Sequence, residues 1–288
     1  MDDLTYQLKQ LCHRSHDGAP NTQSDRLKIL RLCASELIEL GFRHMKATSL
    51  KPKHIEALVQ TWKQQDLSAG TIKNRMAALR WWAEKVNRSS VIPKDNTTLG
   101  IEKRVYVTKN NKAKTLDGDK LSLVTDAHIQ MSLKLQAAFG LRRKESIKFI
   151  VSDADKGDHI ELKGSWTKGG KPRSIPVRTP AQRQLLDELH RFAGKGSLIP
   201  QEKSYIQQRH VYEGQCKQSG LSNMHGLRHQ YAQERYEEFT GWKAPKAEGP
   251  AQKSLSTEER VIDQQARQTI SRELGHERLE VVAVYVGT

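Results

Sequence analysis

The chain has 288 residues, a length at which two domains of ordinary size are a better expectation than one. It carries 48 Lys and Arg against 33 Asp and Glu, and the resulting net charge of +15 indicates a polyanionic partner such as nucleic acid. The longest apolar run, Val281–Val286, is far shorter than the ~20 residues that cross a bilayer, and the start lacks the features of a secretion signal. We therefore expect a cytoplasmic protein without a membrane segment. Three separated cysteines with no CxxC pair predict reduced thiols and no structural metal.

Helical periodicity dominates the first hundred residues. Apolar side chains recur at a spacing of 3.6 residues over 30–41, 55–62 and 72–86, which predicts at least three amphipathic helices. Ser68 stands where it would cap the third of these helices. A solvated polar face or a row of phosphate contacts would explain the cations of that helix equally well, and the candidate DNA contacts are Lys73, Arg75 and Arg80.

A basic segment without apolar periodicity separates the two halves of the chain. The pattern predicts a helical DNA-binding domain over 1–97, a linker over 98–114 and a second domain over 115–288. Both halves are basic, as expected of a protein that encloses DNA between two lobes. The linker itself could follow a DNA groove through Lys103 and Arg104, or serve as a plain exposed tether.

The second half predicts further helices and a small sheet. One helix through Ile129 and Ala137 ends at a turn on Gly140, and the Gly- and Pro-containing stretch 240–255 reads as a mobile surface loop. Two short extended runs, 159–163 and 173–177, predict a β-hairpin or a three-stranded sheet. The remaining helices are expected over 142–150, 180–192, 205–218, 225–239 and 257–274, the last with a capping box at Ser256 and Glu259.

Several short motifs in the second half carry chemistry when they are taken together. Arg142 directly follows a glycine turn, while His225 and Arg228 lie three residues apart and share one helix face. A guanidinium and an imidazole aimed at one point suit a phosphoryl group. Near the C-terminus a glycine ends a helix just before His276, and Tyr285 follows nine residues later. Each motif alone also has an ordinary structural explanation, so the inference depends on the set.

The order of these motifs resembles the tyrosine recombinases, the family of lambda integrase, Cre and the Xer proteins, over nearly the whole chain. The resemblance implies a mainly α fold with a small antiparallel sheet. It also implies a SAM-like helical core-binding domain followed by an α+β catalytic domain. Matching the family's motifs assigns catalytic roles to Arg142, Lys168, His225, Arg228, His276 and Tyr285, supporting roles to Glu145 and His229, and DNA contacts to Lys171 and Arg173.

The resemblance also implies a mechanism. Tyr285 would attack a DNA phosphate and form a 3′-phosphotyrosyl link, with no cofactor, metal or ATP. Arg142, Arg228 and His276 would bind the non-bridging oxygens. Lys168 would protonate the departing 5′ oxygen, and His225 would handle the proton of the tyrosine.

Two features depart from the family pattern. Arg228 and His276 are 48 positions apart, more than in compact members, which indicates an insertion at 240–255 together with an extended helix up to Leu274. The insertion would be either a tolerated surface loop or a contact to DNA or a partner. Only three residues follow Tyr285, whereas relatives often carry a C-terminal helix that docks on a neighbouring protomer. This docking is therefore in question.

The most specific hypothesis is a DNA strand-exchange enzyme that integrates or excises a mobile element. The expected partners are double-stranded DNA, further copies of the chain in a tetramer on synapsed sites, and accessory bending or directionality factors, with the protein on the bacterial nucleoid. Two alternatives stay open at this point: a catalytically silent DNA clamp and an enzyme resembling the type IB topoisomerases.

Overall fold

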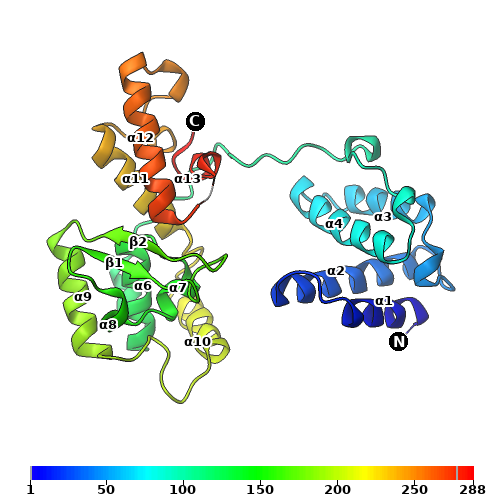
Figure 1. Cartoon of the computed structure of the whole chain (residues 1–288), viewed down its shortest axis with the longest axis horizontal. Helices are drawn as coiled ribbons and strands as arrows, with labels where there is room; N and C mark the ends of the chain where they lie inside the picture. The colour runs from blue at the N-terminus through cyan, green and yellow to red at the C-terminus, as the bar shows by residue number, and fades with distance from the viewer. Residues whose placement is uncertain (1, 277) are drawn as a thin grey trace. The chain divides into compact units, whose positions relative to one another are not determined.

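The computed structural model, which describes residues 2–276 and 278–288, folds as two units (Figure 1). The first unit ends at Val105 and the second spans Tyr106–Thr288, so the division falls within the segment 98–114. No helix in the part of the chain that the structure describes is long and apolar enough to cross a membrane.

Four helices around an apolar core form the first unit. Trp62 and Trp82 are fully buried there, and each indole nitrogen has a partner, because Trp62 donates to Glu36 at 2.7 Å and Trp82 to the carbonyl of Ala47 at 2.9 Å. Ser68 caps the last helix, as predicted, by accepting from the amide of Thr71. The first helix was not predicted. The elements are α1 (Asp3–Arg14), α2 (Pro20–Glu39), η1 (Ala47–Ser49), α3 (Pro52–Gln64), α4 (Ala69–Lys85), η2 (Ser89–Val91) and η3 (Thr97–Leu99).

The second unit places a two-stranded sheet beside a helical core. Strands β1 (His159–Leu162) and β2 (Arg173–Pro176) pair antiparallel, with Ile160 opposite Ile175, so the predicted hairpin is confirmed and the three-stranded alternative is not found among the described residues. Helix α6 contacts α7, α9 and α11. The helices up to α11 are α5 (Gly118–Ser122), α6 (Ala127–Phe139), α7 (Arg143–Ile147), α8 (Val151–Ala154), α9 (Pro180–Ala193), α10 (Tyr205–Gln218) and α11 (Gly226–Thr240).

Helix α12 (Thr257–Leu274) is locked to α11 by two buried polar groups of the same composition. In each group a carboxylate of α12 accepts from a tyrosine hydroxyl of α11 and pairs with an arginine. Buried pairs of this kind are costly to break, because the partner left behind has no water to replace the lost contact. The first group joins Glu273 to Tyr231 and Arg235, and the second joins Asp263 to Tyr236 and Arg267.

The stretch 240–255 is not the open surface loop that its composition predicts. It contains two short turns, η4 (Pro245–Ala247) and η5 (Gln252–Ser254), and buries Ala244 and Leu255. Turn η4 packs against a short C-terminal helix, α13 (Ala283–Val286), which follows η6 (Leu279–Val281). Because both partners are too short to show periodicity, their contact leaves no pattern in the sequence.

Candidate active site

Gly140 determines the direction in which the chain leaves α6 and enters the site. It ends α6 in the left-handed conformation at φ +60°, and a Cβ atom built on it would lie only 2.6 Å from the ring of Tyr231. The chain therefore leaves α6 in a sharp turn and brings Arg142 to the start of α7, where its side chain is about one-fifth exposed. The predicted glycine turn before Arg142 is confirmed.

Glu145 is the acidic centre of the site. Its fully buried carboxylate accepts from the backbone amide of Arg142 at 2.7 Å, from the Arg142 guanidinium at 2.8 Å, and from both terminal nitrogens of Arg173 at 2.9 and 2.6 Å. Burial alone would raise the pKa of Glu145. The hydrogen bonds and charge of Arg173, followed by the charges of Arg228 and Arg142, outweigh that effect and lower the pKa to about 2.

Arg228 is buried, and it forms no ion pair with a carboxylate among the described residues. Its guanidinium donates to the carbonyls of Gly140 and Leu274, which lie at the C-terminal ends of α6 and α12. Helix C-terminal carbonyls carry partial negative charge and so stabilise a cation there. Burial and the charge of Arg142 lower the pKa of Arg228 to about 10, which still leaves the group charged at neutral pH. Its Nη2 also lies 3.4 Å from Nε2 of His276.

Three histidines stand close to Arg228, and each is held in its neutral form. Burial and the charges of Arg228 and Arg142 lower the pKa of His276 to about 3. Burial and the neighbouring His225 lower the pKa of His229 to about 4. Partial loss of hydration, together with Arg228 and Arg142, also lowers the pKa of His225.

Tyr285 on α13 is surrounded by these groups. Its ring centre lies 4.6 Å from that of His229, 5.3 Å from that of His276 and 6.1 Å from that of His225. The guanidinium carbon of Arg228 is 5.8 Å from the same ring. The structure therefore brings together residues that are up to 60 positions apart in the chain, from His225 to Tyr285.

Lys168 lies on the connection between β1 and β2 and is exposed. It lines a cavity of about 710 Å³ together with Arg142 and His276, so these three predicted residues share one opening to solvent. Arg272 of α12 lines the same cavity and was not predicted. The one sequence feature that could have indicated Arg272 is its position, four residues before His276.

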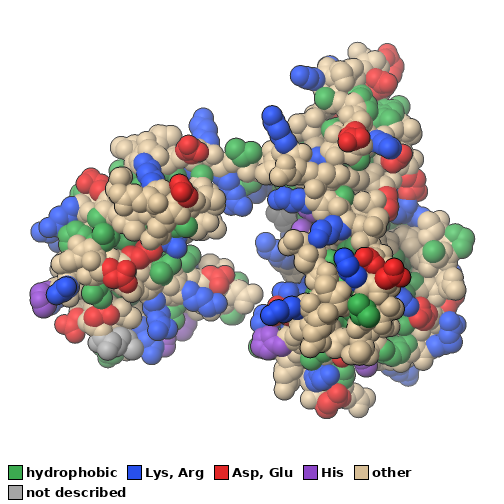
Figure 2. All heavy atoms as spheres, turned by 180° about the vertical axis from the view of Figure 1, so that it is seen from behind, with side chains coloured by type: hydrophobic (Ala, Val, Ile, Leu, Met, Phe, Trp, Pro, Cys, Tyr) green, Lys and Arg blue, Asp and Glu red, His purple; other side chains and the backbone are tan. Residues whose placement is uncertain are grey.

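The predicted DNA contacts fall into two groups. Arg75 pairs with Glu36 at 2.9 Å, Arg80 donates to Asn96 at 2.6 Å, and Arg173 pairs with Glu145, so these three arginines already have partners within the protein. Lys and Arg side chains are otherwise spread over the surface of each unit (Figure 2). Among the remaining candidates, Lys73 is partly exposed, and Lys103, Arg104 and Lys171 are exposed.

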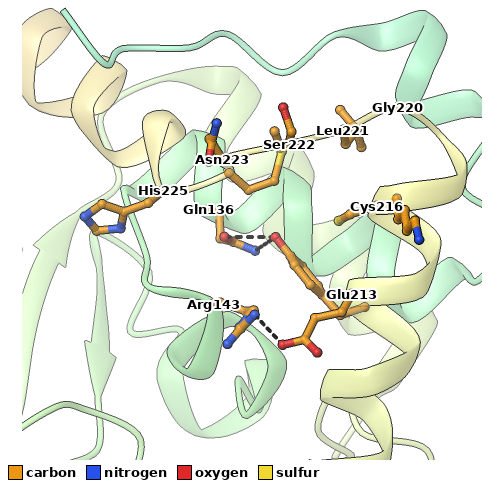
Figure 3. A pocket seen from close by; sticks show the side chains of 12 residues that line it. Gln136, Arg143, Glu213, Cys216, Gly220, Leu221, Ser222, Asn223 and His225 are labelled. Carbon is orange, nitrogen blue, oxygen red and sulfur yellow. Dashed lines mark hydrogen bonds and ion pairs between the residues drawn. The ribbon is translucent and has the colours of Figure 1, made fainter. Parts of the chain in front are cut away.

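A separate cavity of about 670 Å³ also has His225 in its wall. Figure 3 shows that the imidazole points away from Cys216 and Glu213. Its arginine, Arg143, pairs with Glu213 at 2.9 Å, and Gln136 pairs with Tyr212 at 3.1 Å. It is therefore a poorer anion site than the cavity of Arg142 and Lys168. Within the described ranges, no group of three or more His, Cys, Asp and Glu is placed to hold a metal ion.

Two family models match the chain, phage integrase N-terminal over residues 1–91 and integrase over residues 103–234. Arg142, Lys168, His225 and Arg228 lie in the matched ranges, whereas His276 and Tyr285 lie beyond them. A search of curated proteins finds no match.

Solved structures show the same fold. The Tn1549 transposon integrase in complex with circular intermediate DNA is 13% identical with a TM-score of 0.59, over 100% of this chain and 96% of that chain. The XerH site-specific recombinase bound to difH substrate is 15% identical with a TM-score of 0.57, over 98% of this chain and 80% of that chain. A lambda integrase tetramer bound to a Holliday junction is 16% identical with a TM-score of 0.58, over 95% of this chain and 77% of that chain. Likeness at these identities establishes the architecture, and the chemistry has to be argued from the residues of the site.

Proposed function

Because the chain belongs to the tyrosine recombinase family and is a DNA breaking and rejoining recombinase, we propose that it cuts its target site through a covalent 3′-phosphotyrosyl intermediate on Tyr285. We further propose that its substrate is the end of a mobile element that it integrates or excises. The match to the integrase family and the likeness to a transposon integrase support this second point.

A cluster of buried nitrogen atoms without a hydrogen-bond partner supports the proposal most directly. Nε of Arg228, Nδ1 of His276 and Nδ1 of His229 are all unpartnered among the described residues, and all three side chains surround the Tyr285 ring. A buried polar atom left unpaired costs about 1–3 kcal/mol, so a cluster of them marks a place where an outside acceptor binds. The guanidinium groups of Arg228 and Arg142 make that acceptor an anion, and a phosphodiester has the matching oxygens.

The tautomer of His276 follows from its contact with Arg228. A guanidinium nitrogen can only donate, so Nε2 of His276 must accept from it, and the ring proton then lies on Nδ1. That N–H is the unpartnered one. His276 therefore offers a donor to a non-bridging oxygen of the phosphate while remaining uncharged.

The proposed cleavage step balances within the site. The phenol oxygen of Tyr285 forms a bond to phosphorus, and the bond from phosphorus to the 5′ oxygen breaks. His225 takes the proton of the phenol, which requires a neutral imidazole, and Lys168 gives a proton to the departing 5′ oxygen. Arg142 and Arg228 stabilise the charge that grows on the non-bridging oxygens. A 5′ hydroxyl of another strand reverses these steps and rejoins the DNA.

We propose that the protein acts as a tetramer on two synapsed DNA sites, with accessory proteins setting direction. One solved structure of the same fold is a tetramer on a Holliday junction, which supports this assembly. Lys73, Lys103, Arg104 and Lys171 remain our candidates for contacts with the phosphate backbone.

A nicked suicide duplex made from the repeat that borders the element tests the proposal. The nick releases the leaving strand after cleavage, so the covalent protein–DNA product accumulates and is seen on a denaturing gel. We expect this product with the wild type and with Tyr6→Phe, which changes an exposed tyrosine of the first unit, and its complete loss with Tyr285→Phe.

The two alternatives give different results in the same assay. A catalytically silent clamp would bind the duplex without any covalent product from the wild type. A type IB topoisomerase would form the product on supercoiled plasmid that lacks the repeat. A covalent product from Tyr285→Phe would show that another residue is the nucleophile.

A further inference from the structure

The stretch 240–255 holds the helix that carries Tyr285. Turn η4 packs against α13, and Nζ of Lys246 donates to the carbonyl of Val284 at 2.6 Å. Gly287 approaches the same turn so closely that a Cβ atom on it would lie 3.0 Å from the amide nitrogen of Lys246 and 3.1 Å from the Cβ atom of Pro245. The stretch that lengthens the interval between Arg228 and His276 is therefore part of the support for the nucleophile.

Helix α13 needs such support because of its length. With four residues it is far below the length at which a helix is stable in water. The last carbonyl groups of any helix also have no partner within the helix. Tyr285 must nevertheless bring its hydroxyl to about 3–3.5 Å from a phosphorus atom with the right angle of attack.

Side chains from three other elements satisfy these carbonyls. Lys246 of η4 donates to Val284, Gln233 of α11 donates to Tyr285 at 2.9 Å, and Arg267 of α12 donates to Gly287 at 2.8 Å. Gln233 and Arg267 belong to long helices that are held by other contacts, whereas Lys246 belongs to the short turn that packs directly on α13. The three donors, which we call the α13 clamp, fix the backbone on both sides of the tyrosine.

We propose that Lys246 is a positioning residue for the nucleophile, acting through the carbonyl of Val284 to hold Tyr285 beside Arg228 and His276. The proposal rests on the proposed function, because it assigns Lys246 a part in the same cleavage step. Its cationic group suits the C-terminal end of a helix, where the exposed carbonyls carry partial negative charge.

Burying the charge of Lys246 lowers the stability of the folded protein. Burial and the nearby charge of Lys112 lower the pKa of Lys246. A methionine at this position would keep the aliphatic stem and remove the cost of burying the charge. A residue whose only role is to stabilise the fold would not be expected to bury a charge at this cost. The effect of Lys246→Met on the melting temperature therefore separates a stabilising role from a positioning role.

The test compares Lys246→Met with Lys246→Arg, which keeps a cationic donor, and with Lys243→Met as the matched control. Lys243 is an exposed lysine three positions earlier in the same stretch. Hydrogen exchange of the full-length protein without DNA reports on the amides of Tyr285, Val286 and Gly287, all bonded within the last turn. We expect exchange at these amides to be at least about tenfold faster in Lys246→Met than in wild type and in Lys243→Met, a ratio that corresponds to about 1.4 kcal/mol.

The second measurement is the rate of covalent complex formation on the nicked duplex at saturating protein. For Lys246→Met we expect a rate at least about tenfold lower, with unchanged DNA affinity and an unchanged or higher melting temperature. Lys246→Arg should recover most of the rate, and Lys243→Met should match wild type.

The outcomes separate this proposal from the proposed function. Unchanged exchange in Lys246→Met would overturn the part of Lys246 in the α13 clamp whether or not the wild type cuts DNA. Faster exchange with an unchanged cleavage rate would overturn the positioning role alone. If the wild type forms no covalent product, the proposed function fails and the positioning role for Lys246 in cleavage falls with it.

Discussion

Replacing Glu145 by glutamine removes the carboxylate that pairs with Arg142 and Arg173 and faces Arg228, and the structure sets the size of the effect. The pKa of Glu145 drops from its ordinary value of 4.5 to about 2. At about 1.4 kcal/mol for each tenfold change in proton affinity, the folded protein favours the ionised carboxylate by about 3 kcal/mol. The side chain is 1% exposed, so solvent does not screen this interaction. We expect Glu145→Gln to destabilise the second unit by about that amount at pH 7.

The pH dependence has a definite sign. The folded pKa of Glu145 lies below its unfolded pKa, so the contribution is complete above about pH 4.5 and is lost as the pH falls toward 2. The stability difference between wild type and Glu145→Gln should therefore be constant from pH 7 to about pH 5.5. By pH 3 it should shrink by more than half.

Scanning calorimetry of the full-length protein measures this difference, and the unfolding transition of the first unit serves as an internal standard. About 3 kcal/mol corresponds to a decrease of roughly 6–12 °C in the melting temperature of a unit of this size. Glu213→Gln is the matched control, because Glu213 pairs with Arg143 at 2.9 Å on the surface and should shift stability by less than about 1 kcal/mol. A deficit below about 1 kcal/mol at pH 7, or one that stays constant down to pH 3, would refute the role of Glu145 as the charge centre of the site.

Two further predictions concern Lys168 and Gly140. Lys168→Ala should leave DNA affinity nearly unchanged and slow cleavage by about 10²–10⁴-fold. A 5′-thio leaving group, which needs no proton, should restore the rate of this variant in a single-turnover assay. If the defect persisted with the thio substrate, Lys168 would not be the general acid. Gly140→Ala should destabilise the second unit by about 2 kcal/mol or more in urea unfolding, because alanine is disfavoured at φ +60° and its Cβ atom would meet Tyr231. Gly214→Ala in the exposed part of α10, where nothing lies within 4 Å of the added atom, should instead raise stability by about 0.5–1 kcal/mol, and equal effects at the two positions would contradict the packing argument.

The sequence was informative wherever the signal was local. Helices α10 and α12 have the predicted bounds, and the capping box of Ser256 and Glu259 is present. These features depend on residues within one or two turns of one another, so a single sequence contains the evidence for them. Helix α1 carries a local signal of the same kind, because its buried residues Leu4, Leu8 and Cys12 recur every four positions.

Long-range pairing could not be predicted in the same way. Arg75 was expected on DNA because it shares a helix face with other cations, and Arg173 because of its place in the family's motif. Their partners, Glu36 and Glu145, are 39 and 28 positions away, and no local pattern connects them. The packing of 240–255 on α13 was not predicted for the same reason. A loop that packs on another element can have the same composition as a loop that does not.

The arrangement of charge explains how one site can both bind and activate a phosphate. Among the described residues, Arg142 and Arg173 pair with the carboxylate of Glu145, and the charge of Arg228 also lowers its pKa. Arg228 is held there by helix-end carbonyls, which orient it without cancelling its charge as a second carboxylate would. The adjacent imidazoles stay neutral first because they are buried and then because the charges of Arg228 and Arg142 oppose their protonation, and neutral rings are what a proton acceptor and an uncharged donor require. The positive charge that attracts the phosphate therefore adds to the effect of burial in keeping the imidazoles that act on it neutral.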